Sequence, residues 1–409
     1  MSTAALLAGV RIVEVSLLGA ASITTALSDL GADVIKVEPP GGDYGRDMTW
    51  PIVEGTSLLF LHLNRGKRSV VIDLRTAEGV EVFEALVRDA DVVVEAMRPG
   101  ALERRGLGYD RLREINPRVV FMAMSGFGDT GPYRSLPSHG IAFDTWAGIV
   151  EPEVDEEGLC SIPPHVSIGL NAAPLYGAVS ILAGVIHARA TGEGCRLELA
   201  QSDAAVAFDW LRTETERAHE RPESEVHGNA VDGFERRAPG IAGMAGSVRY
   251  QIYATSDGYV LLMASERKFW RNFCAAIGRA DLFETHSGAD HADHARGDLA
   301  LKRELAEEFR QRSSAEWLAL GVRDDIPIAP VNTRESLRSD PQFLDRLPWL
   351  PAARFGADMV PHPVRVDGAV ISAPGRAPDL GQHTDEVLGA LLTPVPSPIQ
   401  QSRAQGAVA

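Results

Sequence analysis

Cysteine pairs, a basic leader and long apolar runs are missing from this sequence. Its 409 residues include three cysteines, and none of them stands in a Cys-x-x-Cys pair. This excludes a disulfide framework and a cysteine zinc site, and it is typical of a reducing cytosol. The N-terminus has no basic segment before its short apolar run, unlike a signal peptide. The apolar run 172–186 is shorter than the ~20 residues of a membrane span, so we predict a cytoplasmic protein without a membrane partner.

Basic residues are also in deficit. The 40 Lys and Arg residues stand against 56 Asp and Glu residues, which gives a formal net charge of −16. Such a charge disfavours nucleic acid and anionic membranes as partners, although a local basic pocket can still bind a small anion. The hydrophobic content of 45% is enough for a large core, and the length suggests two or three domains.

The first half of the chain alternates strand and helix patterns. Short runs rich in Val and Ile predict strands, and apolar residues at helical spacing between them predict helices. This alternation favours an α/β fold with a parallel sheet and helices on both faces. The predicted strands are 10–15, 33–37, 69–74, 91–95, 118–124 and 196–199, and the predicted helices are 22–30, 77–89, 109–115, 173–190 and 203–217, with one more beginning near Ser138.

A change of composition marks the second half. Residues 214–235 are mostly charged and polar, which predicts a linker or mobile segment. The sequence Ser256-Asp257-Gly258 lies between two strand patterns and predicts a β-hairpin. Helical patterns follow at 266–277, 299–312, 315–320 and 384–392, and the tail after about residue 393 is predicted to be disordered.

Three histidines lie close together in the second half. His286, His291 and His294 occur in a stretch of small and polar residues, which predicts a solvated loop. We therefore expect no metal site there, and no other group of residues suggests one.

Six segments resemble motifs of one enzyme family, in the same order along the chain. They are 27–38, 62–73, 93–108, 116–132, 326–332 and 377–388. Together they resemble the family III CoA-transferases of the CaiB/BaiF type over nearly the whole chain. The resemblance implies a Rossmann-like large domain, a smaller α+β domain, and an interlocked-ring dimer in which each chain threads through the other. We assign residues 1–215 and 326–409 to the large domain and residues 216–325 to the small domain with its linkers.

The chain departs from this family at the position of the nucleophile. In the family, a single aspartate near the start of the helix predicted from residue 173 attacks the thioester of the acyl-CoA. The aligned position here holds Leu170, followed by Asn171. Neither side chain is a carboxylate, and an amide cannot form the acyl anhydride that the reaction needs. We therefore predict a CoA-transferase scaffold without its nucleophile.

Basic side chains are the candidates for binding coenzyme A. The phosphates need fixed cations, and arginine can bind two phosphate oxygens at once, although solvation of a surface residue is the simpler explanation for any one of them. The family site also implies a mobile glycine-containing loop over the thioester, and two positions where Asn-Phe is usual. The candidates are Lys67, Arg68, Arg98 and Arg104 for the phosphates, Ala96 and Met97 at the Asn-Phe positions, and Gly243 in the loop.

His139 suggests a second chemistry. It aligns with the base of the family's 2-methylacyl-CoA racemases, and an imidazole suits abstraction of a proton near neutral pH. Those racemases also use the aspartate that is missing here, and a histidine that merely forms hydrogen bonds near a helix N-terminus is the alternative. Asp144 and Asp203 are the nearest other carboxylates, and capping or solvent exposure is the simpler expectation for both.

Three functions remain open at this point. The first is a subunit of an acyl-CoA:carboxylate CoA-transferase, paired in a heterodimer or heterotetramer with a homologous subunit that keeps the aspartate. The second is a self-sufficient acyl-CoA racemase or isomerase, active as a homodimer with His139 as its base. The third is a non-enzymatic acyl-CoA-binding protein. The acyl group is not identified by any residue pattern.

Overall fold

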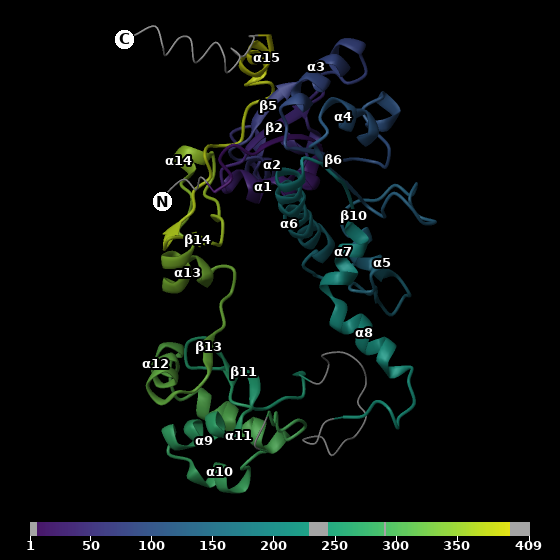
Figure 1. The fold of residues 1–409 in the computed structure, drawn as a ribbon. Helices are drawn as coiled ribbons and strands as arrows, with labels where there is room; N and C mark the ends of the chain where they lie inside the picture. The colour runs from purple at the N-terminus through teal and green to yellow at the C-terminus, as the bar shows by residue number, and fades with distance from the viewer. Residues whose placement is uncertain (1–5, 229–243, 290–291, 393–409) are drawn as a thin grey trace. The chain divides into compact units, whose positions relative to one another are not determined.

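A computed structural model describes residues 6–228, 244–289 and 292–392 of the chain (Figure 1). The chain divides into two compact units. The large unit comprises residues 1–208 and 345–409, and the small unit comprises residues 209–344. The predicted disordered tail and Gly243 lie outside the described residues.

The large unit is built on a six-stranded parallel sheet, as the strand and helix patterns predicted. Its strand order is β10-β7-β6-β1-β2-β5, and all neighbouring strands are parallel. The chain therefore builds outward from β1 in one direction, through β2 and β5, and then in the other. The strands are β1 (Arg11–Ser16), β2 (Asp33–Glu38), β5 (Arg68–Val71), β6 (Val92–Ala96), β7 (Val120–Ser125) and β10 (Arg196–Ala200).

Helices cover both faces of this sheet, which is why most residues of its central strands are apolar. One face packs against α1 (Ser22–Asp29) and α6 (Ile168–Thr191). The other face packs against α3 (Ala77–Arg88), α4 (Tyr109–Ile115) and α15 (Thr384–Leu392). The α15 contact shows that the end of the described chain returns to the large unit.

Helix α6 is longer than the sequence pattern predicted and is apolar around its whole circumference. It begins at Ile168 rather than near residue 173, so Leu170 and Asn171 lie in its first turn. Gly177 lets it approach α1 closely, since a Cβ there would lie 2.4 Å from Ile23. Among the described residues, α6 alone has the length and composition to cross a membrane, but half of that segment is buried within the fold.

The small unit has a three-stranded antiparallel sheet and an aromatic core. β11 (Tyr250–Ala254) and β12 (Tyr259–Met263) form the predicted hairpin, and β13 (Ile328–Pro330) pairs with β12. This pairing places residues 328–330 in the small unit, so the predicted domain end at residue 325 was too early. The core rings of Tyr253, Trp270, Phe273, Phe309 and Trp317 come from β11 and from α9 (Arg267–Ala276), α11 (Leu299–Phe309) and α12 (Ser314–Asp324).

Two further predictions need correction. The helix predicted at 203–217 is divided at Asp209, whose backbone is not helical, into α7 (Gln201–Phe208) and α8 (Trp210–His219). Residues 214–219 are therefore helical rather than part of a linker. The helix predicted near Ser138 begins at Ala142, as α5 (Ala142–Trp146).

The remaining elements are short. They are η1 (Leu18–Ala21), η2 (Tyr44–Arg46), β3 (Ile52–Val53), β4 (Thr56–Ser57), α2 (Leu58–Leu63), η3 (Glu103–Arg105), β8 (Glu153–Val154), β9 (Cys160–Ser161), α10 (Ala280–Thr285), η6 (Ser336–Ser339), α13 (Pro341–Arg346), α14 (Ala352–Phe355), β14 (Arg365–Val366) and β15 (Ala369–Val370).

Candidate functional site

The sheet changes its building direction between β1 and β6. In open α/β sheets, ligands bind outside the carboxyl ends of the strands at such a point. β6 ends at Ala96, and Met97 and the exposed Arg98 follow its carboxyl end directly. Three of the predicted CoA-binding residues therefore lie where the topology favours a ligand.

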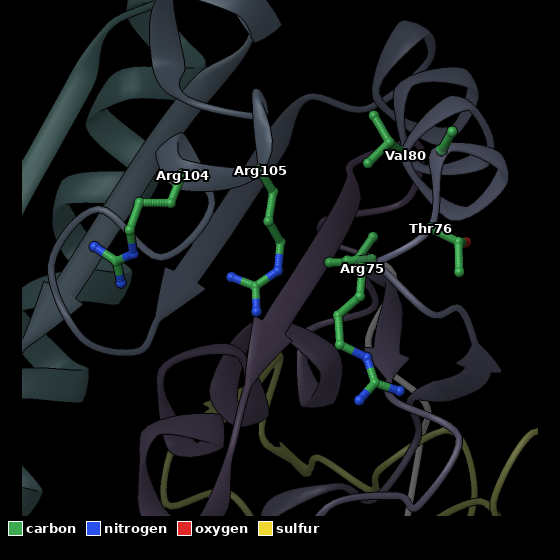
Figure 2. A pocket seen from close by; sticks show the side chains of 7 residues that line it. Arg75, Thr76, Val80, Arg104 and Arg105 are labelled. Carbon is green, nitrogen blue, oxygen red and sulfur yellow. The ribbon is translucent and has the colours of Figure 1, made fainter.

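A cavity of about 430 Å³ opens at the same edge of the sheet, between the loops after β5 and β6. Figure 2 shows the side chains of Arg75, Arg104 and Arg105 extending in the same direction beside it. Its lining residues are Leu74, Arg75, Thr76, Ala77, Val80, Arg104 and Arg105.

Two of these guanidinium groups are free to bind an anion. Arg104 donates to the carbonyl of Pro99 at 2.9 Å, and Arg105 donates to the carbonyl of Ala101 at 2.6 Å. Within the part of the chain that the structure describes, no carboxylate forms an ion pair with either side chain. Guanidinium groups without a carboxylate partner are suited to bind phosphate oxygens in pairs.

The third guanidinium group has a partner beside it. Arg75 donates to both oxygens of Asp73, each at 2.8 Å, and these bonds lower the pKa of Asp73 to about 2. Three guanidinium groups and one carboxylate thus leave the cavity with excess positive charge. Arg75 and Arg105 are not among the residues predicted from sequence. Arg75 follows the predicted strand 69–74 directly, and this position at the carboxyl end of a parallel strand is a signal that marks it.

Lys67 has an internal partner instead of a free surface. Its side chain is fully buried, and its ammonium donates to the carboxylate of Glu14 at 2.9 Å and to the carbonyl of Ala21 at 2.8 Å. Burial lowers the pKa of Lys67 to about 8. The structure therefore assigns this ammonium to the interior of the sheet rather than to the arginine cavity.

Arg68 lies at the opposite edge from the cavity, because it begins β5. Its guanidinium donates to both oxygens of Asp33, at 2.9 and 2.6 Å, and to Glu386 at 3.2 Å. Arg68 was grouped with Arg98 and Arg104 as a phosphate ligand from sequence. The direction of the strands places it at the opposite edge of the sheet from them.

The start of α6 carries no exposed carboxylate among the described residues there. Leu170 is half-buried, and the exposed Asn171 turns its amide back to the carbonyl of Ser167. Asp144 reaches this helix end from α5, but its carboxylate is fully buried. It accepts the Ser167 hydroxyl at 2.6 Å and the N–H groups of Ile168 and Gly169 at 3.1 and 2.7 Å. Asp144 therefore caps α6, which satisfies N–H groups that the helix itself leaves unpaired.

His139 is exposed in the loop before α5. Its neighbour Ser138 packs closely on Gly126, which follows the carboxyl end of β7, so His139 is held near the same edge of the sheet. Asp203 is exposed in the first turn of α7.

The described residues contain no group of three or more His, Cys, Asp or Glu side chains that could hold a metal ion. His291 lies outside them. His286 lies 3.4 Å from Asp298, and His294 forms a hydrogen bond with Ser265, so the two described histidines have separate partners.

Known proteins match the chain over most of its length. The family model described as CoA-transferase family III matches residues 7–384. The human succinyl-CoA:glutarate CoA-transferase is 28% identical over 94% of this chain and 86% of its own length. The beta subunit of succinyl-CoA–L-malate CoA-transferase from Chloroflexus aurantiacus is 30% identical, with 94% of each chain covered.

A solved structure agrees with this relationship. The crystal structure of a CaiB/BaiF family protein from Brucella suis matches with a TM-score of 0.75 and 28% identity, and the match covers 95% of this chain and all of that one. CoA-transferases act on CoA thioesters, which a site rich in arginine suits. Because the family model spans both units of the fold, the chain belongs to CoA-transferase family III, the CaiB/BaiF type.

Proposed function

We propose that this chain is the non-nucleophilic subunit of a heteromeric acyl-CoA:carboxylate CoA-transferase. The observation that carries the proposal is the first turn of α6, which contains Leu170 and Asn171 and no acidic residue. The resemblance to the family implies that its nucleophile would stand at this position. The nearby Asp144 does not replace the nucleophile, since its buried carboxylate is already occupied by three hydrogen bonds.

CoA would bind at the carboxyl edge of the sheet, which then serves as a Rossmann-like binding domain. Arg98, Arg104 and Arg105 would hold its phosphates, and Ala96 and Met97 would lie along the ligand. The excess positive charge of the cavity supports this assignment on a chain whose net charge is −16. Phosphate binding by such a pocket does not require a basic protein, because the field close to the guanidinium groups is local.

The homologous partner would supply the aspartate. Its carboxylate would attack the thioester carbon, the C–S bond would break, and the CoA thiolate would leave while a mixed anhydride forms. A carboxylate acceptor would then complete the exchange. The relative from Chloroflexus aurantiacus is named as a beta subunit, which supports a division of roles between chains.

The exposed face of α6 supports a partner chain. Leu175, Val179 and Ile186 follow helical spacing and are 59, 68 and 70% exposed. A helix that is apolar all round is normally covered on every side, and the described residues bury only half of the apolar segment of α6. We propose that a homologous chain covers it in an interlocked-ring dimer.

The test is coexpression of this chain with a homologue that carries the aspartate. We expect a stable complex by native mass spectrometry, with transfer of CoA from succinyl-CoA to a carboxylate that the purified chain alone does not catalyse. Formation of a hydroxylamine-sensitive acyl-enzyme on the unmodified chain alone would contradict the proposal.

A single substitution examines the nucleophile position directly. Leu170→Asp is expected to form an acyl-enzyme with succinyl-CoA, because it returns a carboxylate to the start of α6. Leu170→Asn is the matched control, since asparagine has the same shape as aspartate but cannot form an anhydride. Equal labelling of the two variants would show that position 170 does not face the thioester.

His139 is exposed, which is compatible with one alternative function. In that alternative the chain is an acyl-CoA racemase or isomerase with His139 as its base. The purified chain would then exchange the α-proton of an acyl-CoA in D₂O, and His139→Ala would abolish the exchange. Absence of exchange in the unmodified chain would exclude this alternative. CoA binding without turnover by any assembly would instead favour a non-enzymatic acyl-CoA-binding protein.

A further inference from the structure

The turn after β1 is held in an unfavourable backbone conformation. Leu18 has a φ of 55°, in the left-handed region that is sterically unfavourable for a residue with a side chain. Such conformations persist only where the surroundings enforce them, and they are concentrated at functional sites. β1 ends at Ser16, so this turn borders the point where the sheet changes direction, beside the end of β6.

Asp43 enforces the conformation of this turn. Its two carboxylate oxygens both accept the N–H of Leu18, each at 3.1 Å, and one of them also accepts the N–H of Gly45 at 2.8 Å. Asp43 is only 2% exposed. A carboxylate this deeply buried needs a compensating charge, because its desolvation is otherwise very costly.

Lys36 provides that charge and also holds the other end of the turn. Its ammonium lies 3.1 Å from Oδ2 of Asp43 and donates to the carbonyl of Ser16 at 2.9 Å. Burial alone would lower the pKa of Lys36, but the nearby carboxylates of Glu14 and Asp43 outweigh it and raise the pKa. One buried ammonium therefore joins the end of β1 to the carboxylate that holds Leu18.

The turn that this arrangement holds lies outside the hydrogen-bonded part of the sheet. The backbone hydrogen bonds of β1 to β2 and β6 end at or before Ser16, so the turn lies beyond the ladder that holds the sheet together. Residues 17–20 are also partly exposed, which leaves the turn accessible to a ligand. The buried pair thus acts on backbone beside the point where the sheet changes its building direction.

We propose that Asp43, held by Lys36, is a positioning residue for coenzyme A. It keeps the turn at Leu18 in the one conformation that leaves the carboxyl ends of β1 and β6 shaped for the ligand. The inference rests on the proposed function, since it concerns the same CoA site. Asp43 acts through the backbone of the turn and does not itself contact CoA.

Asp43→Asn tests the inference, with Asp29→Asn as its matched control. Asp29 forms an equally buried ion pair with Arg65, at 2.6 Å, but it ends α1 and lies toward the amino edge of the sheet. Both variants lose a buried pair and some stability. Calorimetric titration with CoA is expected to show affinity weakened about tenfold by Asp43→Asn and less than about twofold by Asp29→Asn, a tenfold change being about 1.4 kcal/mol.

A second substitution separates positioning from folding. Glycine adopts a positive φ without steric cost, so Leu18→Gly added to Asp43→Asn is expected to recover most of the lost CoA affinity. Leu18→Gly alone is the reference for the double variant, and the two are expected to bind CoA with similar affinity. Unchanged affinity in Asp43→Asn, or a double variant as weak as Asp43→Asn, would overturn the inference.

Hydrogen exchange distinguishes failure of the inference about Asp43 from failure of the proposed function. In the unliganded chain, Asp43→Asn is expected to accelerate exchange at the amide of Leu18, whereas Asp29→Asn leaves that amide unchanged. Unchanged exchange in Asp43→Asn would overturn the inference by itself. Failure of the unmodified chain to bind CoA, with accelerated exchange in Asp43→Asn, would instead overturn the proposed CoA site and the role of Asp43 in it.

Discussion

Arginines at the two edges of one sheet have different partners. At the amino edge, Arg11 and Arg68 share the carboxylate of Asp33, at 3.2 and 2.6 Å. At the carboxyl edge, Arg104 and Arg105 donate to the backbone carbonyls of Pro99 and Ala101. Arginine therefore forms ion pairs within the fold at one edge and remains available to bind an anion at the other. For these four arginines, strand direction decides the edge at which each residue emerges and so which partners lie near it.

The buried charges between the two edges provide the strongest test of this comparison. Glu14 has no exposed surface and accepts Lys67 at 2.9 Å and Lys36 at 3.5 Å, whereas the Asp33 side chain at the amino edge is 36% exposed. Glu14→Gln is expected to reduce the free energy of unfolding by about 3–5 kcal/mol, the usual loss when one partner of a buried pair is removed. Asp33→Asn should cost about 0–1 kcal/mol. Urea unfolding measures both losses. Equal losses would show that burial does not make the Glu14 pairs more stabilising than the exposed Asp33 pairs.

Removal of the free arginines should give the next largest effect. The double variant Arg104→Ala with Arg105→Ala is expected to weaken CoA binding roughly 100-fold, because a hydrogen bond to a charged group contributes about 1.5–3 kcal/mol. Arg68→Ala is the control at the amino edge and should change the affinity less than about twofold. Isothermal titration with CoA gives both values. Weaker binding by Arg68→Ala than by the double variant would show that CoA binds at the amino edge instead of the carboxyl edge.

Acid should weaken the interior of the sheet in a defined pH range. The nearby Lys67 and Lys36 outweigh burial and hold the pKa of Glu14 at about 2, below the usual 4.5. The unfolded chain therefore binds this proton first as the pH falls, and the stabilisation from Glu14 is lost between pH 4.5 and 2. By pH 3 the loss is roughly 2 kcal/mol. Urea unfolding at pH 5 and pH 3 measures this loss. The Glu14→Gln variant should not show the part of the pH dependence of the unfolding free energy that comes from Glu14.

The smallest expected effect concerns the arginine that already has a partner. Arg75→Ala is expected to weaken CoA binding only about threefold, because its pair with Asp73 already satisfies much of its hydrogen bonding. Asp73→Asn should have the opposite sign and strengthen binding by about the same factor, since it frees Arg75 and removes a negative charge. Binding titrations at constant salt compare the two variants. Weaker binding by Asp73→Asn would mean that the carboxylate orients Arg75 for the ligand.

Local patterns predicted the parallel sheet well because its central strands are short, mostly apolar and separated by clear helical patterns. Boundaries were less predictable where they depend on contacts. Helix α6 begins at Ile168 because the carboxylate of Asp144, which lies on another helix, caps its first N–H groups. β13 belongs to the small unit because it pairs with β12, which is distant in sequence. Neither contact has a signal within the segment itself.

The candidate site was predictable only in part. Ala96, Met97, Arg98 and Arg104 follow a strand that the sequence indicates clearly, and their place at the carboxyl edge follows from its direction. Lys67 was indistinguishable from them in sequence, because its burial depends on Glu14, which is 53 residues away.

The sequence by itself determined the alternation of strands and helices, the family, and the absence of a carboxylate at Leu170. These are properties of local pattern and residue type, which no neighbour can alter. Only the tertiary structure decided which charges are paired inside the fold, which arginines stay available, and that Asp43 holds the turn at Leu18. Pairing and burial depend on distances between segments that the chain brings together only when the sheet forms.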